Sequence, residues 1–311
     1  MWTAARIACV VSLSVLAAQD SPSPGDEAGQ QASAPVLSTL TTLADAAKLA
    51  ELEKSGRILF EDDFETEGSL ARYFEVRGAE GGRTLRTVDS ALAHRGTGAL
   101  QLTSPASEGR SSGAGVSGWL GDVGHRRVHL RYYLKFAADY DQGNLNHTGG
   151  CLVAAAGTNK WAGMGTAGIL PTGEDHFSSA FETWRDWGRA ASPGFAHLYT
   201  YWMEMKRDRD GNYWGNMLGP QTEQRIVPPR GQWTCFELML RANEVGEADG
   251  ELAAWIDGKL YVHYTGLRWR KGADVLLKRF GLDVYVHRAE RANVVWYDDL
   301  VVSTGYVGPV R

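Results

Sequence analysis

Residues 128–136 read Val-His-Leu-Arg-Tyr-Tyr-Leu-Lys-Phe, and this stretch decides the fold class. Apolar or aromatic side chains occupy its first position and every second one after it, while His129, Arg131, Tyr133 and Lys135 stand between them. Successive side chains of a β-strand point to opposite faces of its sheet. The pattern therefore predicts a strand with one face in the core and one polar face.

The same kind of segment recurs along the chain. Further strands are expected over residues 196–205, 233–242, 251–257, 276–287 and 293–304. Turn-forming sequences such as Asp210-Gly211-Asn212 and Asp257-Gly258 separate them. We find no internal repeat, which disfavours a propeller or a solenoid. With 37 glycines and 11 tryptophans in 311 residues, of which 43% are hydrophobic, the chain is predicted to be an all-β, two-sheet antiparallel sandwich or jelly roll.

The first part of the chain has a different composition. Residues 1–18 are predicted to be a signal peptide, because Arg6 precedes an apolar run that is too short to span a bilayer. Residues 19–56 are expected to form a disordered tether to about Ser38 and a short helix over 40–54, and residues 57–311 the folded domain. The protein is therefore expected to be secreted or periplasmic, monomeric and free of the membrane after cleavage.

Charge and cysteine content narrow the partners and the covalent structure. The net charge is only −5, whereas a nucleic-acid-binding protein carries a strong basic excess, so no nucleic-acid partner is expected. In an oxidising compartment Cys151 and Cys235 can pair, and two buried free thiols are the alternative.

Three of the expected strands present aromatic side chains among ionisable ones. One face of residues 196–205 carries His197, Tyr199 and Tyr201. One face of residues 276–287 carries Asp283, Tyr285 and His287, and the third face is the polar face of residues 128–136. A solvated outer face explains any one of them, but three such faces favour a groove, since aromatic rings stack on sugars and polar groups orient them.

Two acidic clusters lie near the ends of the expected domain. They are Glu61-Asp62-Asp63-Phe64-Glu65 and Tyr297-Asp298-Asp299-Leu300. Carboxylates are costly to bury or crowd unless a cation or hydrogen-bond donors meet them. The clusters therefore indicate either a bound metal ion or a set of catalytic carboxylates.

Five segments, in this order along the chain, carry a resemblance to a known group of proteins. They are Phe60-Glu61-Asp62-Asp63-Phe64-Glu65, Ala93-His94-Arg95-Gly96-Thr97-Gly98-Ala99-Leu100, Trp233-Thr234-Cys235-Phe236-Glu237, Ala254-Trp255-Ile256-Asp257-Gly258 and Val295-Trp296-Tyr297-Asp298-Asp299. Together they resemble the concanavalin-A-like β-jelly rolls of the glucuronan lyases and of the fungal cellulose-induced Cip-type proteins. Residues 147–216 look closer to alginate-lyase-like jelly rolls, which carry a Tyr-x-Tyr pair on a central concave strand, here Tyr199 and Tyr201.

The resemblance implies a structural calcium ion that joins the first strand to the last. Glu65 and Asp298 would supply carboxylates, and Arg95 and Gly98 would supply backbone carbonyl oxygens. The relatives can carry Ser or Asn at the two carbonyl positions, and Asp299 is an alternative to Asp298.

The resemblance also implies a secreted polysaccharide lyase that cleaves a uronate-containing polysaccharide by β-elimination. In such a reaction Tyr199 and Tyr201 would act as acid or base, with His197 as an alternative base. Arg131 or Lys135 would neutralise the substrate carboxylate. Substrate binding would fall to Tyr133, Arg185, Asp283, Tyr285 and His287.

Departures from the pattern keep two other functions open. The alginate-lyase-like relatives carry a Ser and an Arg two residues apart on the strand before the tyrosine pair, whereas this sequence has Ser179 and Phe181, and Glu182 next to them is expected to repel a polyuronate. A non-catalytic, lectin-like jelly roll with a structural calcium is therefore the main alternative. A retaining glucanase is a weaker one, because Glu61 and Glu65 on a regular strand would lie about 13 Å apart, while a retaining pair needs about 5 to 5.5 Å between its carboxyl groups.

Overall fold

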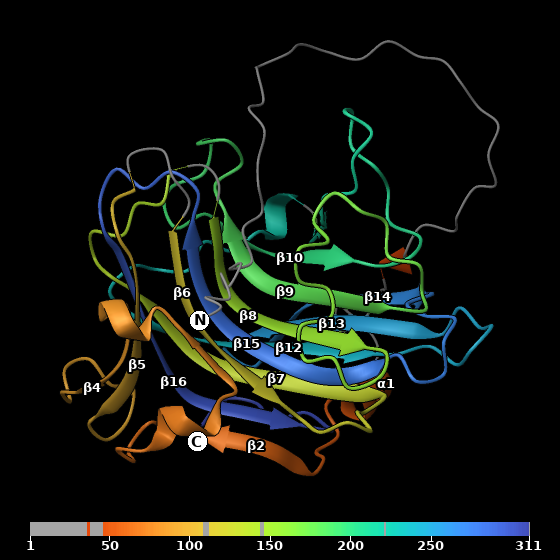
Figure 1. Cartoon of the computed structure of the whole chain (residues 1–311), viewed down its shortest axis with the longest axis horizontal. Helices are drawn as coiled ribbons and strands as arrows, with labels where there is room; N and C mark the ends of the chain where they lie inside the picture. Colours follow the sequence, from red (N-terminus) through yellow and green to blue (C-terminus); the bar gives the residue numbers. More distant parts are fainter. Residues whose placement is uncertain (1–35, 38–45, 108–111, 144–145, 221, 311) are drawn as a thin grey trace, which may run out of the picture.

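The computed structural model describes residues 36–37, 46–107, 112–143, 146–220 and 222–310. The expected signal peptide, most of the expected tether and the first part of the expected helix lie outside these residues. Within them, the strands form two antiparallel sheets, of nine and seven strands, that stack as curved layers (Figure 1). The predicted two-sheet antiparallel sandwich is confirmed.

The nine-stranded sheet contains the first and the last strand of the described chain. Its order is β1 (Val36–Leu37), β14 (Lys259–Leu267), β13 (Gly250–Ile256), β12 (Trp233–Arg241), β7 (Arg127–Phe136), β16 (Asn293–Ser303), β5 (Gly98–Ser104) and β4 (Thr84–Val88), and β2 (Ile58–Asp62) also pairs with β16. The tether was expected to reach about Ser38, but β1 pairs with β14, so the sheet begins inside that segment.

The seven-stranded sheet covers the other side of the sandwich. Its order is β11 (Asn216–Leu218), β10 (Phe195–Tyr201), β9 (His176–Trp184), β8 (Asn146–Ala155), β15 (Leu276–Val286), β6 (Ser112–Trp119) and β3 (Glu75–Arg77). The strand expected over residues 196–205 ends at Tyr201, because the next residues form a turn in which the amide of Met205 donates to the carbonyl of Trp202. The helical segments are α1 (Ala46–Leu52), η2 (Ser69–Arg72), η3 (Ala79–Gly81) and η4 (Thr222–Gln224).

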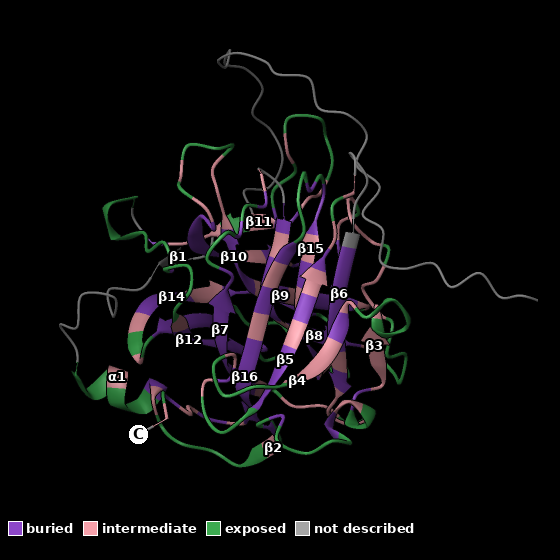
Figure 2. Cartoon of the chain, turned by 90° about the vertical axis from the view of Figure 1, so that its left-hand side faces the viewer, coloured by how far each residue is buried: buried purple, intermediate pink, exposed green. Residues whose placement is uncertain are grey.

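Alternation along the strands fills the space between the sheets. The apolar residues of β7 face inward and meet Phe280, Leu282 and Val284 of β15 in one core cluster. Figure 2 shows buried and partly exposed residues alternating along β9 and β15. The two layers are also joined by Tyr132, whose buried hydroxyl donates to the carbonyl of Phe181 at 2.8 Å and accepts from the amide of Gly150 at 2.9 Å.

The two ends of the described chain cover part of the outer face of the nine-stranded sheet. Leu52 of α1 packs on Met239, Ala253 and Trp255. The amide of Tyr306 donates to the carbonyl of Lys54, which joins the C-terminal segment to the end of α1. This outer face is therefore largely buried, although it points away from the core of the sandwich.

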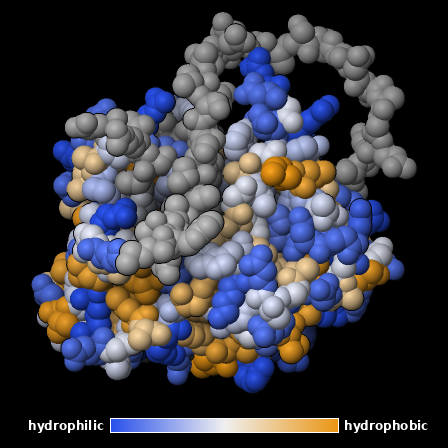
Figure 3. All heavy atoms as spheres, viewed as in Figure 1, coloured by the Kyte–Doolittle hydropathy of each residue, from blue (hydrophilic) through white to orange (hydrophobic). Residues whose placement is uncertain are grey.

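Residues that remain on the surface are mixed in character. On the side seen in Figure 3, hydrophobic residues gather in small patches between hydrophilic ones. Large exposed hydrophobic side chains include Val123, Trp161 and Ile169. None of the described helices reaches the length and apolar character that a membrane-spanning helix requires.

Cys151 and Cys235 are free thiols. Cys151 lies on β8 of the seven-stranded sheet and Cys235 on β12 of the nine-stranded sheet. Each points to the outer side of its own sheet, because its strand neighbours Leu152 and Phe236 point into the core. The whole sandwich separates the two sulfur atoms, so the alternative of two free thiols is the correct one.

Candidate functional site

The outward face of the seven-stranded sheet has a floor of small residues. Cross-strand pairing places Tyr199, Ala180, Cys151, Gly281 and Ser117 in one row across five strands. A Cβ atom on Gly281 would lie 3.1 Å from the Sγ atom of Cys151, so the floor is already tightly packed at this point. Larger polar and aromatic side chains rise on both sides of this row. We call this surface the tyrosine face, defined by His147, Cys151, Ala180, Glu182, Tyr199, Tyr201, Gly281, Asp283 and Tyr285.

A buried carboxylate between two histidines lies at one side of the floor. Glu182 of β9 is 4% exposed, and both of its carboxylate oxygens lie 3.0 Å from Nδ1 of His147. Its Oε1 also lies 3.6 Å from Nε2 of His197. Burial opposes the charge of His147, but the adjacent Glu182 carboxylate outweighs it and raises the pKa of His147. Burial lowers the pKa of His197 to about 4, so His197 is neutral at physiological pH.

The two tyrosines of β10 adjoin this group. The hydroxyls of Tyr199 and Tyr201 lie 3.3 Å apart, and the ring of Tyr199 lies 5.0 Å from that of His147. Burial and the neighbouring Tyr201 raise the pKa of Tyr199 well above its usual value. Tyr199 is therefore a neutral hydroxyl, able to donate a proton, beside an imidazole whose orientation is set by Glu182.

Asp283 and Tyr285 of β15, and His287 directly after it, lie on the same side of the row as His147 and Glu182. Tyr285 stacks near His147 at 6.1 Å between ring centroids, and His287 lies 5.6 Å from His147. Burial lowers the pKa of His287 to about 3. Asp283 forms an ion pair with Arg77 of β3, and a Cβ atom on Gly115 between them would lie 2.2 Å from a carboxylate oxygen of Asp283. Only glycine fits at position 115 with this ion pair in place.

The structure thus brings together many of the residues expected from the sequence. Those on the tyrosine face or beside it are His197, Tyr199, Tyr201, Asp283, Tyr285 and His287. It adds His147, which the sequence did not single out, and Cys151, which the sequence considered only as a disulfide partner, and it gives Glu182 a histidine partner. The signal available for His147 was its place on an alternating segment, two positions before a glycine pair.

Three expected residues do not belong to this face, and here the prediction of one shared site is wrong. Arg131, Tyr133 and Lys135 point outward from β7, as the alternation predicted, but β7 lies in the nine-stranded sheet. The hydroxyl of Tyr133 accepts from the amide of Val310, and the ammonium of Lys135 donates to the carbonyl of Ala91. Tyr133 and Lys135 hold the covering segments, and all three residues lie on the opposite side of the sandwich from Tyr199.

Arg185, which was expected to contact substrate, ties loops together. Its Nη1 atom donates to a carboxylate oxygen of Asp141 at 2.8 Å and to the carbonyl of Gly143 at 3.3 Å. Its Nε atom donates to the carbonyl of Ala190. The guanidinium group therefore joins the loop after β7 to the loop after β9.

Ser179 and Phe181 also lie away from the tyrosine face. Phe181 belongs to the core, and the hydroxyl of Ser179 is buried 2.9 Å from that of Thr200. These two positions point into the sandwich, and Ser178, Ala180 and Glu182 occupy the outward positions of β9. The Ser-x-Arg pattern of the alginate-lyase-like relatives is therefore replaced by core residues.

Both acidic clusters hold the turn that contains residues 94–98. Oε1 of Glu65 accepts from the amides of Thr97 and Gly98, and its Oε2 accepts from the hydroxyl of Thr97. Oδ2 of Asp298 accepts from the amides of His94 and Arg95. The amide of Gly98, followed by that of Thr97, lowers the pKa of Glu65, whereas burial raises the pKa of Asp298 to about 7.

The oxygen atoms around this turn are of the kind that calcium binds. A carboxylate offers about four acceptor positions, and the hydrogen bonds of Glu65 and of Asp298 occupy three on each residue. One position on each carboxylate is therefore left, and Arg95 and Gly98 can add only backbone carbonyls. Among the described residues, no group of three or more His, Cys, Asp or Glu side chains is arranged to hold a metal ion, so any such site depends on backbone oxygens.

The acidic pattern of Glu61, Asp63 and Glu65 is not on the tyrosine face. It begins on β2, which pairs with β16 of the nine-stranded sheet, and all three side chains are exposed. A glucanase site built on this motif would therefore lie on the other sheet from the row of small residues.

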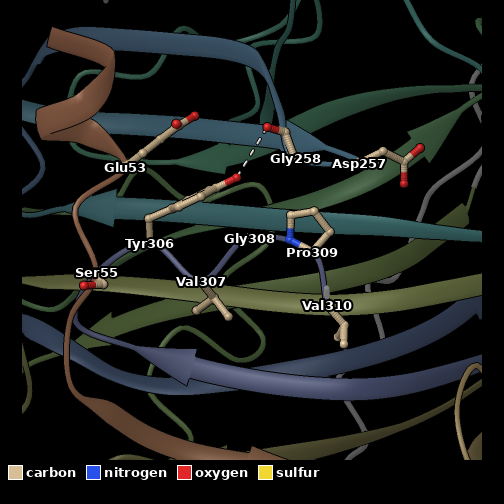
Figure 4. Close-up of a pocket in the computed structure, with 9 residues that line it drawn as sticks. All are labelled: Glu53, Ser55, Asp257, Gly258, Tyr306, Val307, Gly308, Pro309 and Val310. Carbon is tan, nitrogen blue, oxygen red and sulfur yellow. Dashed lines mark hydrogen bonds between the residues drawn. The ribbon is translucent and has the colours of Figure 1, made fainter. Parts of the chain in front are cut away.

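A shallow hollow lies beside the C-terminal segment, on the nine-stranded sheet. Figure 4 shows Glu53, Ser55 and Asp257 around it, with Tyr306 pointing toward Gly258, whose carbonyl accepts from the tyrosine hydroxyl at 3.4 Å. Residues 306–310 form its other wall. The hollow does not connect to the tyrosine face, because the two belong to opposite sheets.

No protein-family model matches the sequence, and no curated protein matches it. Solved structures do match the fold. The PL-14 alginate lyase from Aplysia kurodai superposes with a TM-score of 0.60 at 16% identity, over 79% of this chain and 99% of that one. The endo-β-1,4-glucuronan lyase from Trichoderma reesei superposes with a TM-score of 0.53 at 16% identity, over 79% of this chain and 95% of that one. The cellulose-induced protein Cip1 superposes with a TM-score of 0.50 at 15% identity, over 81% of this chain and 100% of that one. The chain therefore has the jelly-roll fold of polysaccharide-lyase-type proteins, and the predicted resemblance is confirmed for the fold.

Proposed function

We propose that this protein is a polysaccharide lyase that cleaves a uronate-containing polymer by β-elimination on its tyrosine face. The observation that carries the proposal is the position of His147, held by Glu182, with its ring 5.0 Å from the ring of Tyr199, whose hydroxyl is neutral. A base and an acid thus lie side by side over a floor of small residues. The solved structures of the same fold include enzymes that cleave alginate and glucuronan, which supports a polysaccharide as the partner.

The chemistry assigns a step to each side chain. The neutral imidazole of His147 removes the proton α to the uronate carboxylate, and the electron pair of that C–H bond forms the new carbon–carbon double bond. The bond to the glycosidic oxygen breaks at the same time, and the hydroxyl of Tyr199 protonates the leaving oxygen. Hydroxyls of Tyr201 and Tyr285 donate to the substrate carboxylate. His197, which the sequence offered as an alternative base, is buried behind Glu182 and acts as a positioning residue.

The direct test is the ultraviolet absorbance of the unsaturated uronate product. Purified protein would be mixed with glucuronan, alginate, pectate and glycosaminoglycans, and absorbance would rise with at least one of them. Constant absorbance with every polymer, together with retarded migration in a gel that contains the polymer, would identify a non-catalytic glycan-binding jelly roll instead. A polymer substrate of this kind is met outside the cytoplasm, which agrees with the export signal expected in residues 1–18.

The pH dependence of the reaction tests the pairing of His147 with Glu182. The charged and titratable groups around His147 are Glu182, His197, Tyr199, Asp283, Tyr285 and His287. Because His147 must be neutral to act as a base, activity rises as the pH rises through its raised pKa. Glu182→Gln removes the carboxylate but leaves the burial, so the pKa of His147 falls and the acid limb of kcat/KM moves to lower pH. An unchanged acid limb in this variant would contradict the assignment of the base.

The pair of His147 and Glu182 also makes the stability of the fold depend on pH in a defined direction. The pKa of His147 in the folded state lies above its unfolded value of 6.5. The pair therefore stabilises the fold fully below that value, and this stabilisation is lost as the pH rises through the folded-state pKa. Chemical denaturation of wild-type and Glu182→Gln protein at several pH values would show the two curves converging as the pH rises.

We also propose that Glu65, Asp298 and the carbonyls of Arg95 and Gly98 hold a structural calcium ion. An ion that binds only the folded state at 100 times its Kd adds about 2.7 kcal/mol of stability, which raises Tm by roughly 5 °C in a domain of this size. Thermal melts with calcium, with magnesium and with a chelator would measure this. Asp298→Asn is expected to abolish the response to calcium, while Asp299→Asn retains it. Identical melts of the wild-type protein with calcium and with chelator would refute the site.

A further inference from the structure

An exposed tryptophan stands at one end of the tyrosine face. Trp161 lies on the loop between β8 and β9, and 47% of it is exposed. Its ring meets that of Phe74 nearly at right angles, with 5.1 Å between centroids. Lys160 is also exposed, and its ammonium lies 5.5 Å from the ring centroid of Phe74 and 5.9 Å from that of Trp119. A tryptophan ring offers a large apolar surface with a polar N–H group, which suits it to contact a ligand.

The cluster is continuous with the tyrosine face. Cross-strand pairing places Tyr201, Ser178, Val153, Arg279 and Trp119 in one row. This row runs beside the row of small residues and spans four strand spacings, about 19 Å. A polymer lying across the strands from Tyr199 toward β6 would therefore reach the cluster several sugar units away from the reacting bond.

Two contacts hold the cluster in place. The Nη1 atom of Arg279 donates to the carbonyl of Lys160 at 2.9 Å, which ties the loop to β15. The indole nitrogen of Trp119 donates to a carboxylate oxygen of Asp122 at 3.0 Å. In the described part of the chain Lys160 takes part in no ion pair, so its ammonium has charge to offer to a ligand.

We propose that Trp161, with Phe74, Trp119, Lys160 and Arg279, forms a distal subsite that binds an acidic sugar of the polymer. The proposal rests on the function proposed above and deepens it, because it gives the enzyme a preference for long, charged chains. The indole ring supplies a flat apolar surface on which the C–H face of a sugar ring can stack. The ammonium of Lys160 supplies the charge that a uronate carboxylate requires.

A comparison of the Kd values of a long polymer and a disaccharide distinguishes binding at this subsite from binding at the rest of the tyrosine face. Trp161→Ala is expected to raise the Kd of the cleaved polymer, measured by calorimetry, by about 3- to 10-fold, the range that one aromatic contact supplies. It should leave the Kd of a disaccharide from the same polymer unchanged. Ile169→Ala is the matched control, because Ile169 is 60% exposed on the same loop. Its Kd for the polymer should equal that of the wild type.

The role of the Lys160 charge is tested with a separate variant and with a neutral polymer as the control ligand. Lys160→Gln should weaken binding of glucuronan or alginate and reduce its dependence on salt, while binding of a neutral β-glucan stays as in the wild type. Wild-type affinity for the acidic polymer in Trp161→Ala would overturn the subsite, as would equal losses for the disaccharide and the polymer. A wild-type protein that binds none of the acidic polymers would overturn it too.

The subsite and the catalytic proposal can fail separately. If no polymer is cleaved but Trp161→Ala still weakens binding of an acidic polymer, the subsite stands and the lyase is refuted. If Tyr199→Phe abolishes cleavage while Trp161→Ala binds normally, the lyase stands and the subsite is refuted.

Discussion

Replacement of His147 by glutamine is expected to lower the rate of β-elimination by about 100- to 10,000-fold, the contribution of a positioned general base. Glutamine keeps a polar group next to Glu182 but cannot accept the substrate proton at neutral pH. Tyr199→Phe should cause a loss of similar size, because the leaving oxygen then departs without a proton donor. The initial rate of product absorbance measures both effects, with binding of the polymer measured separately and expected to persist.

The double variant distinguishes joint action from two independent roles. If His147 and Tyr199 serve the same transition state, His147→Gln combined with Tyr199→Phe should cost little more than either change alone. Tyr306→Phe is the control, because it removes a tyrosine hydroxyl on the opposite sheet, and its rate should equal that of the wild type. Full activity of His147→Gln would exclude the assigned base.

Sequence periodicity predicted correctly which residues of a strand point into the core, but it did not predict which of the two sheets the strand joins. In β7 the alternation separated core from non-core residues correctly, since Leu130 and Tyr132 are buried in the core and Arg131 and Tyr133 point outward. It contained no information on which of two sheets the strand joins, because both sheets consist of alternating strands. Nor did it indicate that the C-terminal segment covers this outward face, because that contact joins residues 177 positions apart.

The last strand shows a different limit. The sequence left Asp298 and Asp299 open because neither face of residues 293–304 was clearly polar. In the structure the register of β16 on β7 shifts between Asp298 and Val301, and Asp299 has φ +46. Tyr297 and Leu300 therefore both point into the core although they are three positions apart. A bulge of this kind changes which face the following residues occupy, and alternation alone does not reveal it.

The role of Glu182 shows why the chemistry was only partly predictable. Taken alone, a carboxylate on a polyuronate site repels the substrate, and this was the expectation. Its neighbour His147 lies 35 positions away in the sequence and two oxygens of Glu182 face its ring nitrogen. The pairing turns an unfavourable charge into a group that orients a base, and only the register of β8 on β9 brings the two residues together.

Glu237→Ala is expected to lower the free energy of unfolding by about 3 to 5 kcal/mol, because three donors lose their acceptor and each buried donor left unsatisfied costs about 1 to 3 kcal/mol. Glu237 is 1% exposed on the covered side of the nine-stranded sheet. Its Oε1 accepts from the amide of Val307 at 3.0 Å and lies 2.9 Å from Nδ1 of His129, and its Oε2 accepts from the amide of Gly308 at 2.8 Å. Burial lowers the pKa of His129, so the ring is neutral and donates its Nδ1 proton to Glu237. The alanine variant leaves three buried donors without their acceptor.

Urea denaturation measures this loss. Glu61→Ala is the control, since Glu61 is exposed on β2 of the same sheet and should change stability by less than about 0.5 kcal/mol.

Deletion of residues 304–311 should destabilise the protein as well. In the shortened chain water reaches the position of the lost segment, so Glu237→Ala should cost much less there than in the full chain. Equal costs in the two backgrounds would mean that Glu237 acts through His129 alone. Wild-type stability of the full-length alanine variant would contradict the role of Glu237 as the anchor of the C-terminal segment.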